Sequence, residues 1–99
     1  MPQQVPTVSV SELPEDAVIL DVREDFEVAE GMIPGALHIP MGDLQARLSE
    51  LDPAFPIIAV CRSGNRSARV ADALNSAGFS ADTMAGGMTA WTRAGLPTT

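Results

Sequence analysis

Short apolar runs alternate along the chain with amphipathic segments. Two of the runs, residues 17–22 and 55–60, are apolar at almost every position, which predicts strands buried on both faces of a parallel sheet. Shorter segments at 8–10, 36–39 and 80–84 predict three further strands. The pattern therefore predicts about five strands separated by polar or amphipathic connections.

Several of these connections have apolar residues at the spacing of a helix. Leu44, Leu48 and Leu51 lie four and three residues apart on one helical face. Pro53 ends that pattern. Further along the chain a second apolar stripe stops at Gly78, a suitable residue for the end of a helix. The members of this stripe are Val70, Ala73, Leu74 and Ala77.

Two more helices are predicted nearer the ends. Residues 23–31 are acidic and indicate a short helix that closes at Gly31. After a turn at Gly86 and Gly87, the last helix contains Met88, Trp91 and Arg93. Strands that alternate with helices predict an α/β fold of three layers, α/β/α, in which a small central parallel sheet of about five strands is flanked by helices on both faces.

The composition is that of one folded domain. The chain has 99 residues, of which 45% are hydrophobic and 19% charged, so we expect a single domain over residues 1–99 with its core at about 8–97. Its 13 acidic residues outweigh 6 basic ones and give a net charge of −7. This balance argues against nucleic-acid binding, which needs a basic face.

Cysteine usage and hydropathy restrict the expected compartment. One cysteine cannot form an internal disulfide. The first residues lack the basic and apolar regions of a signal peptide, and no apolar run approaches the ~20 residues of a membrane span. We therefore expect a cytoplasmic protein with no membrane partner.

The densest group of chemically active residue types follows the 55–60 strand. It begins at the only cysteine, Cys61, and continues through a short loop: Arg62, Ser63, Gly64, Asn65, Arg66 and Ser67. Ligands of parallel α/β sheets bind beyond the carboxyl ends of the strands, and Cys61 lies at such an end. Asp21 lies near a second strand end and His38 near a third.

A cysteine after an apolar strand is most often an inert buried residue. The loop that follows Cys61 favours a reactive thiol instead, since a structural cysteine needs no arginines beside it. Backbone N–H groups at the start of a helix, and nearby guanidinium groups, lower the pKa of a thiol. We therefore predict a lowered pKa for Cys61.

The charges around this loop differ from those of the whole chain. No acidic residue lies between Asp52 and Asp72, whereas Arg62, Arg66 and Arg69 do. In an acidic chain this predicts a local electropositive island, which would suit an anionic substrate.

Three segments resemble signatures of the single-domain rhodaneses, sulfurtransferases that carry sulfur as a cysteine persulfide. Residues 20–24 with 31–40 resemble the family's N-terminal signature, and residues 60–67 resemble its active-site loop. Residues 86–91 with 95–97 resemble its C-terminal signature. The resemblance covers nearly all of the chain and implies a rhodanese-like fold.

The resemblance also implies a two-step reaction on Cys61. Its thiolate would attack the outer sulfur of thiosulfate, or of a similar small anionic donor, and sulfite would leave. Cyanide, a small thiol or a partner protein would then accept the sulfur. Backbone N–H groups from Arg62 to Ser67 would stabilise the anions. Arg66, with Arg62 second, would hold the sulfonate end of the donor.

Loop length separates this family from the protein phosphatases that share its fold. The phosphatase loop places an arginine six positions after the cysteine, where this chain has Ser67; Arg66 comes one position earlier. The shorter loop is the one that the resemblance associates with a sulfane sulfur. Met32 departs from the family's frequent histidine before Ile-Pro-Gly-Ala, but it lies outside the loop.

The remaining candidates have supporting roles. Asp21 and Arg23 are expected to brace the loops, because an aspartate at a strand end commonly accepts backbone N–H bonds. For His38 a Cys–His pair is one interpretation, and a structural hydrogen bond is the one we favour. One Cys and one His without paired spacing do not make a zinc site, so neither a metal nor another cofactor is expected.

Two other functions use the same thiol. A redox sensor would need its lowered pKa without sulfur transfer. A persulfide relay or regulatory binding module would load sulfur but turn over little until it docks with a partner protein.

Overall fold

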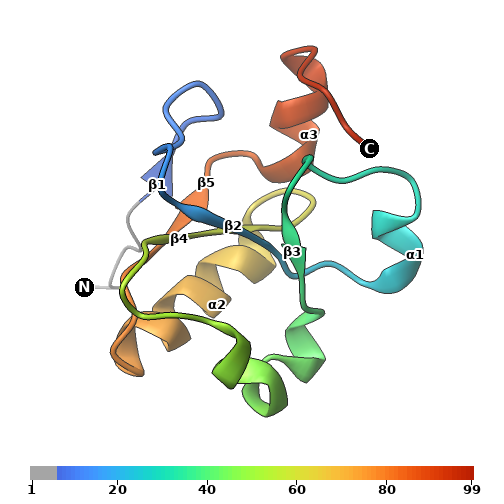
Figure 1. Cartoon of the computed structure of the whole chain (residues 1–99). Helices are drawn as coiled ribbons and strands as arrows, with labels where there is room; N and C mark the ends of the chain where they lie inside the picture. Colours follow the sequence, from blue (N-terminus) through green and yellow to red (C-terminus); the bar gives the residue numbers. More distant parts are fainter. Residues whose placement is uncertain (1–6) are drawn as a thin grey trace.

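A five-stranded parallel sheet forms the centre of the protein, whose structure is a computed structural model that describes residues 7–99 (Figure 1). The strand order is β1-β5-β4-β2-β3, and every neighbouring pair is parallel. The strands are β1 (Thr7–Val8), β2 (Val18–Asp21), β3 (Leu37–His38), β4 (Ile57–Val60) and β5 (Ala81–Met84). Each predicted strand has a counterpart in the sheet.

The strand register places the carboxyl ends of the central strands side by side. Asp21, the last residue of β2, is in register with Val60 of β4 and with His38 of β3. Cys61 follows Val60 directly and therefore emerges next to Asp21. Cys61, Asp21 and His38 each lie at a strand end, as the sequence predicts, and the register brings these three ends together at the carboxyl edge of the sheet.

The helices are α1 (Asp25–Val28), α2 (Asn65–Ser76) and α3 (Gly87–Arg93), with two 3₁₀ helices, η1 (Met41–Asp43) and η2 (Gln45–Glu50). Figure 1 shows α2 on one side of the sheet and α3 on the other. Two hydrophobic clusters fill the two sides, one beneath α2, η1 and η2 and the other beneath α3. The predicted three-layer α/β/α architecture is confirmed.

Residues of β4 alternate between these two clusters because successive side chains of a strand point to opposite faces. Ile57 and Ala59 pack on the α2 side, and Ile58 and Val60 pack on the α3 side. All four are buried, as the continuous apolar run predicts. The same alternation turns the side chain of Cys61 toward the α2 side.

The prediction of an α-helix on the Leu44, Leu48 and Leu51 face is wrong in type. The segment forms the two 3₁₀ helices η1 and η2, in which Leu44 N donates to Met41 O and Leu51 N to Leu48 O. Arg47 leaves helical geometry with φ −114° and ψ 15°. The leucines still pack on the α2-side cluster, so burial determines which side chains face inward while this short segment adopts the tighter turn.

The predicted helix at 23–31 is reduced to the four residues of α1. Glu24 and Glu27 form a reciprocal capping box that begins the helix one residue after Glu24. Gly31 ends the segment with φ +130°, a conformation that favours glycine. After α1, hydrogen bonds from Glu30 N to Glu27 O and from Gly31 N to Val28 O continue the segment as turns, and the Arg23 side chain ties it to the sheet, as described below.

The predicted strand 8–10 is also shorter than expected, since β1 ends at Val8. The chain turns there because Ser9 Oγ accepts a hydrogen bond from Ser11 N, and Ser9 O accepts one from Glu12 N. None of the helices described within residues 7–99 has the length and apolarity to cross a membrane.

Candidate active site

Cys61 lies at the floor of a tight loop between β4 and α2, with 1% of its surface exposed. Its Sγ accepts a hydrogen bond from Gly64 N at 3.0 Å and lies 3.3 Å from Ser67 Oγ, to which the neutral thiol donates. Gly64 lets the loop turn back toward the Cys61 sulfur, because its φ of +108° lies in the left-handed region that glycine adopts without strain. α2 then begins at Asn65, so the last three residues that the sequence places in the loop belong to the first turn of this helix.

The pKa of Cys61 is lowered by its surroundings, as predicted. Burial acts to raise the pKa, but hydrogen bonds from the Ser67 side chain and from the backbone N–H groups of Ser67, Gly64 and Ser63 outweigh it. The Ser67 hydroxyl makes the largest of these lowering contributions. The loop is therefore a cradle for a sulfur anion.

The start of α3, on the side of the sheet opposite to α2, is hydrogen-bonded to this loop. Met88 N donates to Cys61 O at 2.8 Å, and Thr89 N donates to Arg62 O at 3.0 Å. Gly87, at φ +56°, lies directly against the loop backbone: a Cβ at this position would come within 2.3 Å of Cys61 O. The Gly86–Gly87 turn of the sequence is thus part of the site.

The predicted electropositive island does not form as one patch. Arg66 is paired through both guanidinium amino groups with Glu27 of α1, 39 residues away in the sequence. Arg69 lies on the far side, in a groove between α2 and the 3₁₀ helices. Arg62 and Arg69 have no ion-pair partner among the described residues, and of these two only Arg62 lies beside Cys61. The prediction counted charges along the chain and could not include an acid supplied by another element.

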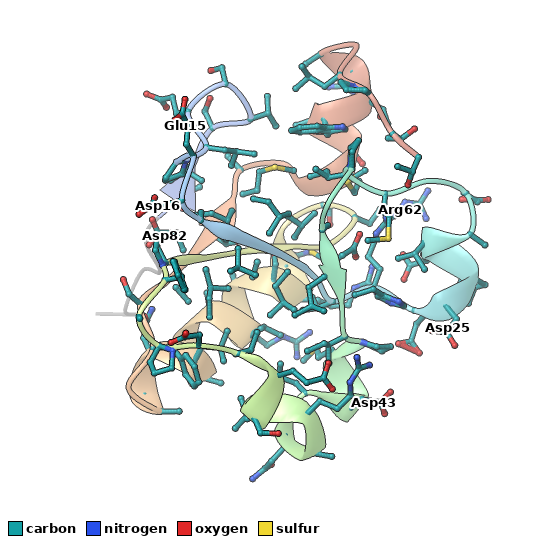
Figure 2. The ribbon with its side chains drawn as sticks, viewed as in Figure 1. Glu15, Asp16, Asp25, Asp43, Arg62 and Asp82 are labelled. Atoms are coloured by element: carbon teal, nitrogen blue, oxygen red, sulfur yellow. The ribbon has the colours of Figure 1, made fainter. Side chains whose placement is uncertain are left out.

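A cleft of about 760 Å³ opens over the loop, between α1 and α3. Arg62 and Arg66 line it together with Met88, and Figure 2 shows Arg62 on the side of the molecule where α1 lies. Phe26 of α1 stands at its edge with 75% of its surface exposed. Ser63 and Asn65, which the sequence places in the loop, are both exposed.

Asp21 and Arg23 form a buried pair at the end of β2. The Asp21 carboxylate accepts hydrogen bonds from Arg23 N, Nε and Nη2 at 2.8–3.1 Å. Arg23 Nη2 also donates to Gly31 O, and His38 Nε2 lies 2.8 Å from Arg23 O. These contacts tie residues 23–31 to the sheet edge, and they give His38 a structural hydrogen bond, the interpretation that we favour from the sequence.

A family model described as the rhodanese-like domain matches residues 8–94 of the chain. The chain belongs to the rhodanese-like domain family. Over 80 residues it is 48% identical to the putative sulfurtransferase YtwF of Bacillus subtilis, covering 81% of this chain and 78% of the relative. Over 84 residues it is 39% identical to a sulfurtransferase of Allochromatium vinosum, covering 84% and 78%.

The fold of this rhodanese-like domain is shared by solved structures. A crystal structure of a rhodanese-related protein from Thermoplasma volcanium superimposes with a TM-score of 0.90 at 29% identity, covering 95% of this chain and 97% of that one. The resemblance and the fold class predicted from the sequence are both confirmed. Within residues 7–99, no group of three or more His, Cys, Asp or Glu side chains is arranged to hold a metal ion.

Thr83 of the rhodanese-like domain is a site residue that sequence reasoning missed. Its Oγ1 lies 2.6 Å from Ser67 Oγ, and both side chains are buried. Ser67 Oγ has Gly64 O and Cys61 Sγ as its other neighbours. With a neutral thiol, Ser67 Oγ accepts from Cys61 Sγ and donates to Gly64 O. Once the thiol is ionised, a hydrogen bond donated by Thr83 to Ser67 lets the single Ser67 proton turn to the thiolate. The only sequence signal is a hydroxyl residue inside the predicted strand 80–84.

We expect Thr83→Val to slow the alkylation of Cys61 by iodoacetamide roughly threefold at neutral pH, about the effect of one net hydrogen bond. Valine keeps the shape of threonine but removes the donor to Ser67, so the thiolate is less stabilised and the pKa of Cys61 rises. The midpoint of the rate–pH profile should therefore move to higher pH, and Thr83→Ser should restore it. An unshifted profile in Thr83→Val would show that Thr83 only packs.

Proposed function

We propose that this rhodanese-like domain is a sulfurtransferase that carries sulfane sulfur as a persulfide on Cys61. The donor is thiosulfate or a similar small anion, and the acceptor is a thiol, or cyanide in an assay. The single observation that carries the proposal is the cradle around Cys61 Sγ, in which the Ser67 hydroxyl and loop N–H groups lower the pKa of the thiol beneath an open cleft. The sulfurtransferase relatives support sulfur transfer as the class of reaction.

The first step forms one S–S bond and breaks another. The Cys61 thiolate attacks the outer sulfur of thiosulfate, and sulfite leaves with the electron pair of the broken bond. One thiolate and one dianion become one persulfide anion and one dianion, so charge balances without an oxidant or a reductant. The acceptor thiolate then attacks the terminal sulfur and releases the Cys61 thiolate.

The loop supplies electrostatic stabilisation to each of these anions. N–H groups of Ser63, Gly64 and Ser67 are already directed at Sγ in the resting site, so little reorganisation is needed. Arg62 has no ion-pair partner among the described residues and is available to the anionic end of the donor. Arg66, which the sequence favours for this role, is already paired with Glu27 through two hydrogen bonds, and this pair limits its binding of the donor.

A persulfide relay that works with a partner protein is the second candidate. Cys61 is only 1% exposed, whereas the cleft above it is far larger than thiosulfate requires and Phe26 is exposed at its edge. Aromatic side chains are enriched in protein–protein interfaces, which supports a docking surface beside the cleft. In this case the free protein loads sulfur but turns over slowly.

The test is the intact mass of the reduced protein after incubation with thiosulfate, beside Cys61→Ser. The proposal requires a gain of one sulfur atom in the wild type only, removed by cyanide as thiocyanate. Fast turnover to cyanide or to a small thiol indicates an independent enzyme, and slow turnover with full loading indicates the relay. Absence of sulfur with any sulfane donor would overturn the persulfide proposal and leave the redox sensor, which peroxide sensitivity of Cys61 would then test.

A further inference from the structure

The Glu27–Arg66 pair occupies the guanidinium group of Arg66, which would otherwise be available to bind a substrate in the active-site cleft. Arg66 Nη1 donates to Glu27 Oε1 at 2.7 Å, and Nη2 donates to Oε2 at 2.8 Å. This is the two-point geometry with which an arginine would bind a sulfonate. The side chains are 29% and 14% exposed, so the pair is only partly screened by solvent.

The pair persists at neutral pH. Hydrogen bonding from Arg66, opposed by burial, lowers the pKa of Glu27 to about 2. Glu27 also accepts a hydrogen bond from Glu24 N within the capping box, which fixes its side chain on α1. An anionic donor therefore meets Arg66 with its charge already neutralised.

The remaining charges of the cleft do not compensate for this loss. Its lining includes as many acids as arginines, namely Glu24, Glu27, Glu30, Arg23, Arg62 and Arg66. Arg23 is itself neutralised by the buried carboxylate of Asp21 behind it. After the two pairs cancel, Arg62 faces two carboxylates and the Cys61 thiolate. A doubly negative donor is repelled twice as strongly by this excess as a singly negative one, because the Coulomb energy is proportional to its charge.

We propose that the Glu27–Arg66 pair is a charge filter, which disfavours dianionic donors such as thiosulfate and makes a singly charged sulfane-sulfur donor, of the persulfide or thiosulfonate class, the preferred substrate. The inference rests on the proposed persulfide chemistry of Cys61. For a persulfide anion RSS⁻, the Cys61 thiolate bonds to the terminal sulfur while the donor's S–S bond breaks and its electron pair leaves on RS⁻. The step consumes one thiolate and one persulfide and forms one thiolate and one persulfide, so no further reactant is needed.

The test compares thiosulfate with methanethiosulfonate, in which a methyl group replaces one anionic oxygen and the transferable sulfur is the same. Glu27→Gln keeps the capping box and one hydrogen bond to Arg66 but removes the competing charge. We expect kcat/KM for thiosulfate to rise about tenfold and kcat/KM for methanethiosulfonate about threefold, since the change of one charge acts on two charges in the first donor and on one in the second.

Glu30→Gln is the matched control, because Glu30 lines the same cleft and has no ion pair among the described residues. It should raise kcat/KM for thiosulfate less than Glu27→Gln does, and thermal unfolding of both variants checks that they fold. Equal effects of the two variants, or an unchanged ratio between the donors in Glu27→Gln, would overturn the filter while the persulfide mechanism stands. Failure of both donors to load sulfur on the wild type would overturn the mechanism and the filter together.

Discussion

Replacement of Gly87 by alanine is expected to lower the free energy of unfolding by about 3 kcal/mol or more, with loss of sulfur loading. The new Cβ would lie 2.3 Å from Cys61 O and 2.7 Å from the carbonyl of Arg62, both backbone atoms that cannot rotate away. Gly87 also has φ +56°, which adds about 1 kcal/mol for a residue with a side chain. Urea denaturation measures the stability, and intact mass after thiosulfate measures the loading.

The loss of function in Gly87→Ala has a specific structural cause. The loop and α3 are joined by the hydrogen bonds from Met88 N to Cys61 O and from Thr89 N to Arg62 O. Separating them moves the carbonyl groups that flank the thiol, and with them the N–H groups that cradle it. The rate of Cys61 alkylation should therefore fall at neutral pH, because the pKa of the thiol returns toward its ordinary value.

Gly95→Ala is the matched control for this substitution. Gly95 follows α3 with a φ of +74°, similar to that of Gly87, but a Cβ there would meet nothing within 4 Å. Gly95→Ala should lower the free energy of unfolding by only about 1 kcal/mol, which is the contribution of the backbone conformation alone, and should leave sulfur loading intact. If the two variants lose the same stability, close packing of α3 on the loop is not what Gly87 provides.

Arg23→Leu should destabilise the protein by about 3–5 kcal/mol, because it leaves the Asp21 carboxylate buried without its charged partner. Asp21 is 1% exposed, and its carboxylate accepts hydrogen bonds from three nitrogen atoms of Arg23. Two of these, from Nε and Nη2, are lost with the side chain, as is the bond from Arg23 Nη2 to Gly31 O. Denaturant unfolding is again the measurement.

Two further variants separate the buried charge from ordinary packing. Arg47→Leu removes the arginine of the exposed pair with Glu50 and should give no measurable change. Arg23→Leu combined with Asp21→Asn removes the unpaired charge as well and should recover part of the lost stability. A double variant no more stable than Arg23→Leu would mean that the charge of Asp21 is not the source of the cost.

Local chemistry in the sequence was enough to predict the sheet and the position of the thiol. The apolar runs before Asp21 and Cys61 are buried strands because nearly every side chain in them is apolar, and the segments after them break that pattern. The burial of successive side chains on both faces requires helices on both sides. The loop glycine Gly64 and the turn at Gly86 and Gly87 all have positive φ, which glycine adopts without strain. These features depend on neighbours along the chain.

The partners of the site residues depended on the tertiary structure instead. Glu27 meets Arg66 across 39 residues and Thr83 meets Ser67 across 16, because the parallel register brings α1, α2 and the end of β5 to the same edge. Charge counted along the chain therefore overstated the positive field at the loop. The Leu44 segment likewise became 3₁₀ because packing, not helical spacing, determined its turns. Sequence thus determined where the thiol lies, and tertiary contacts determined how its anion is stabilised and which charges face its substrate.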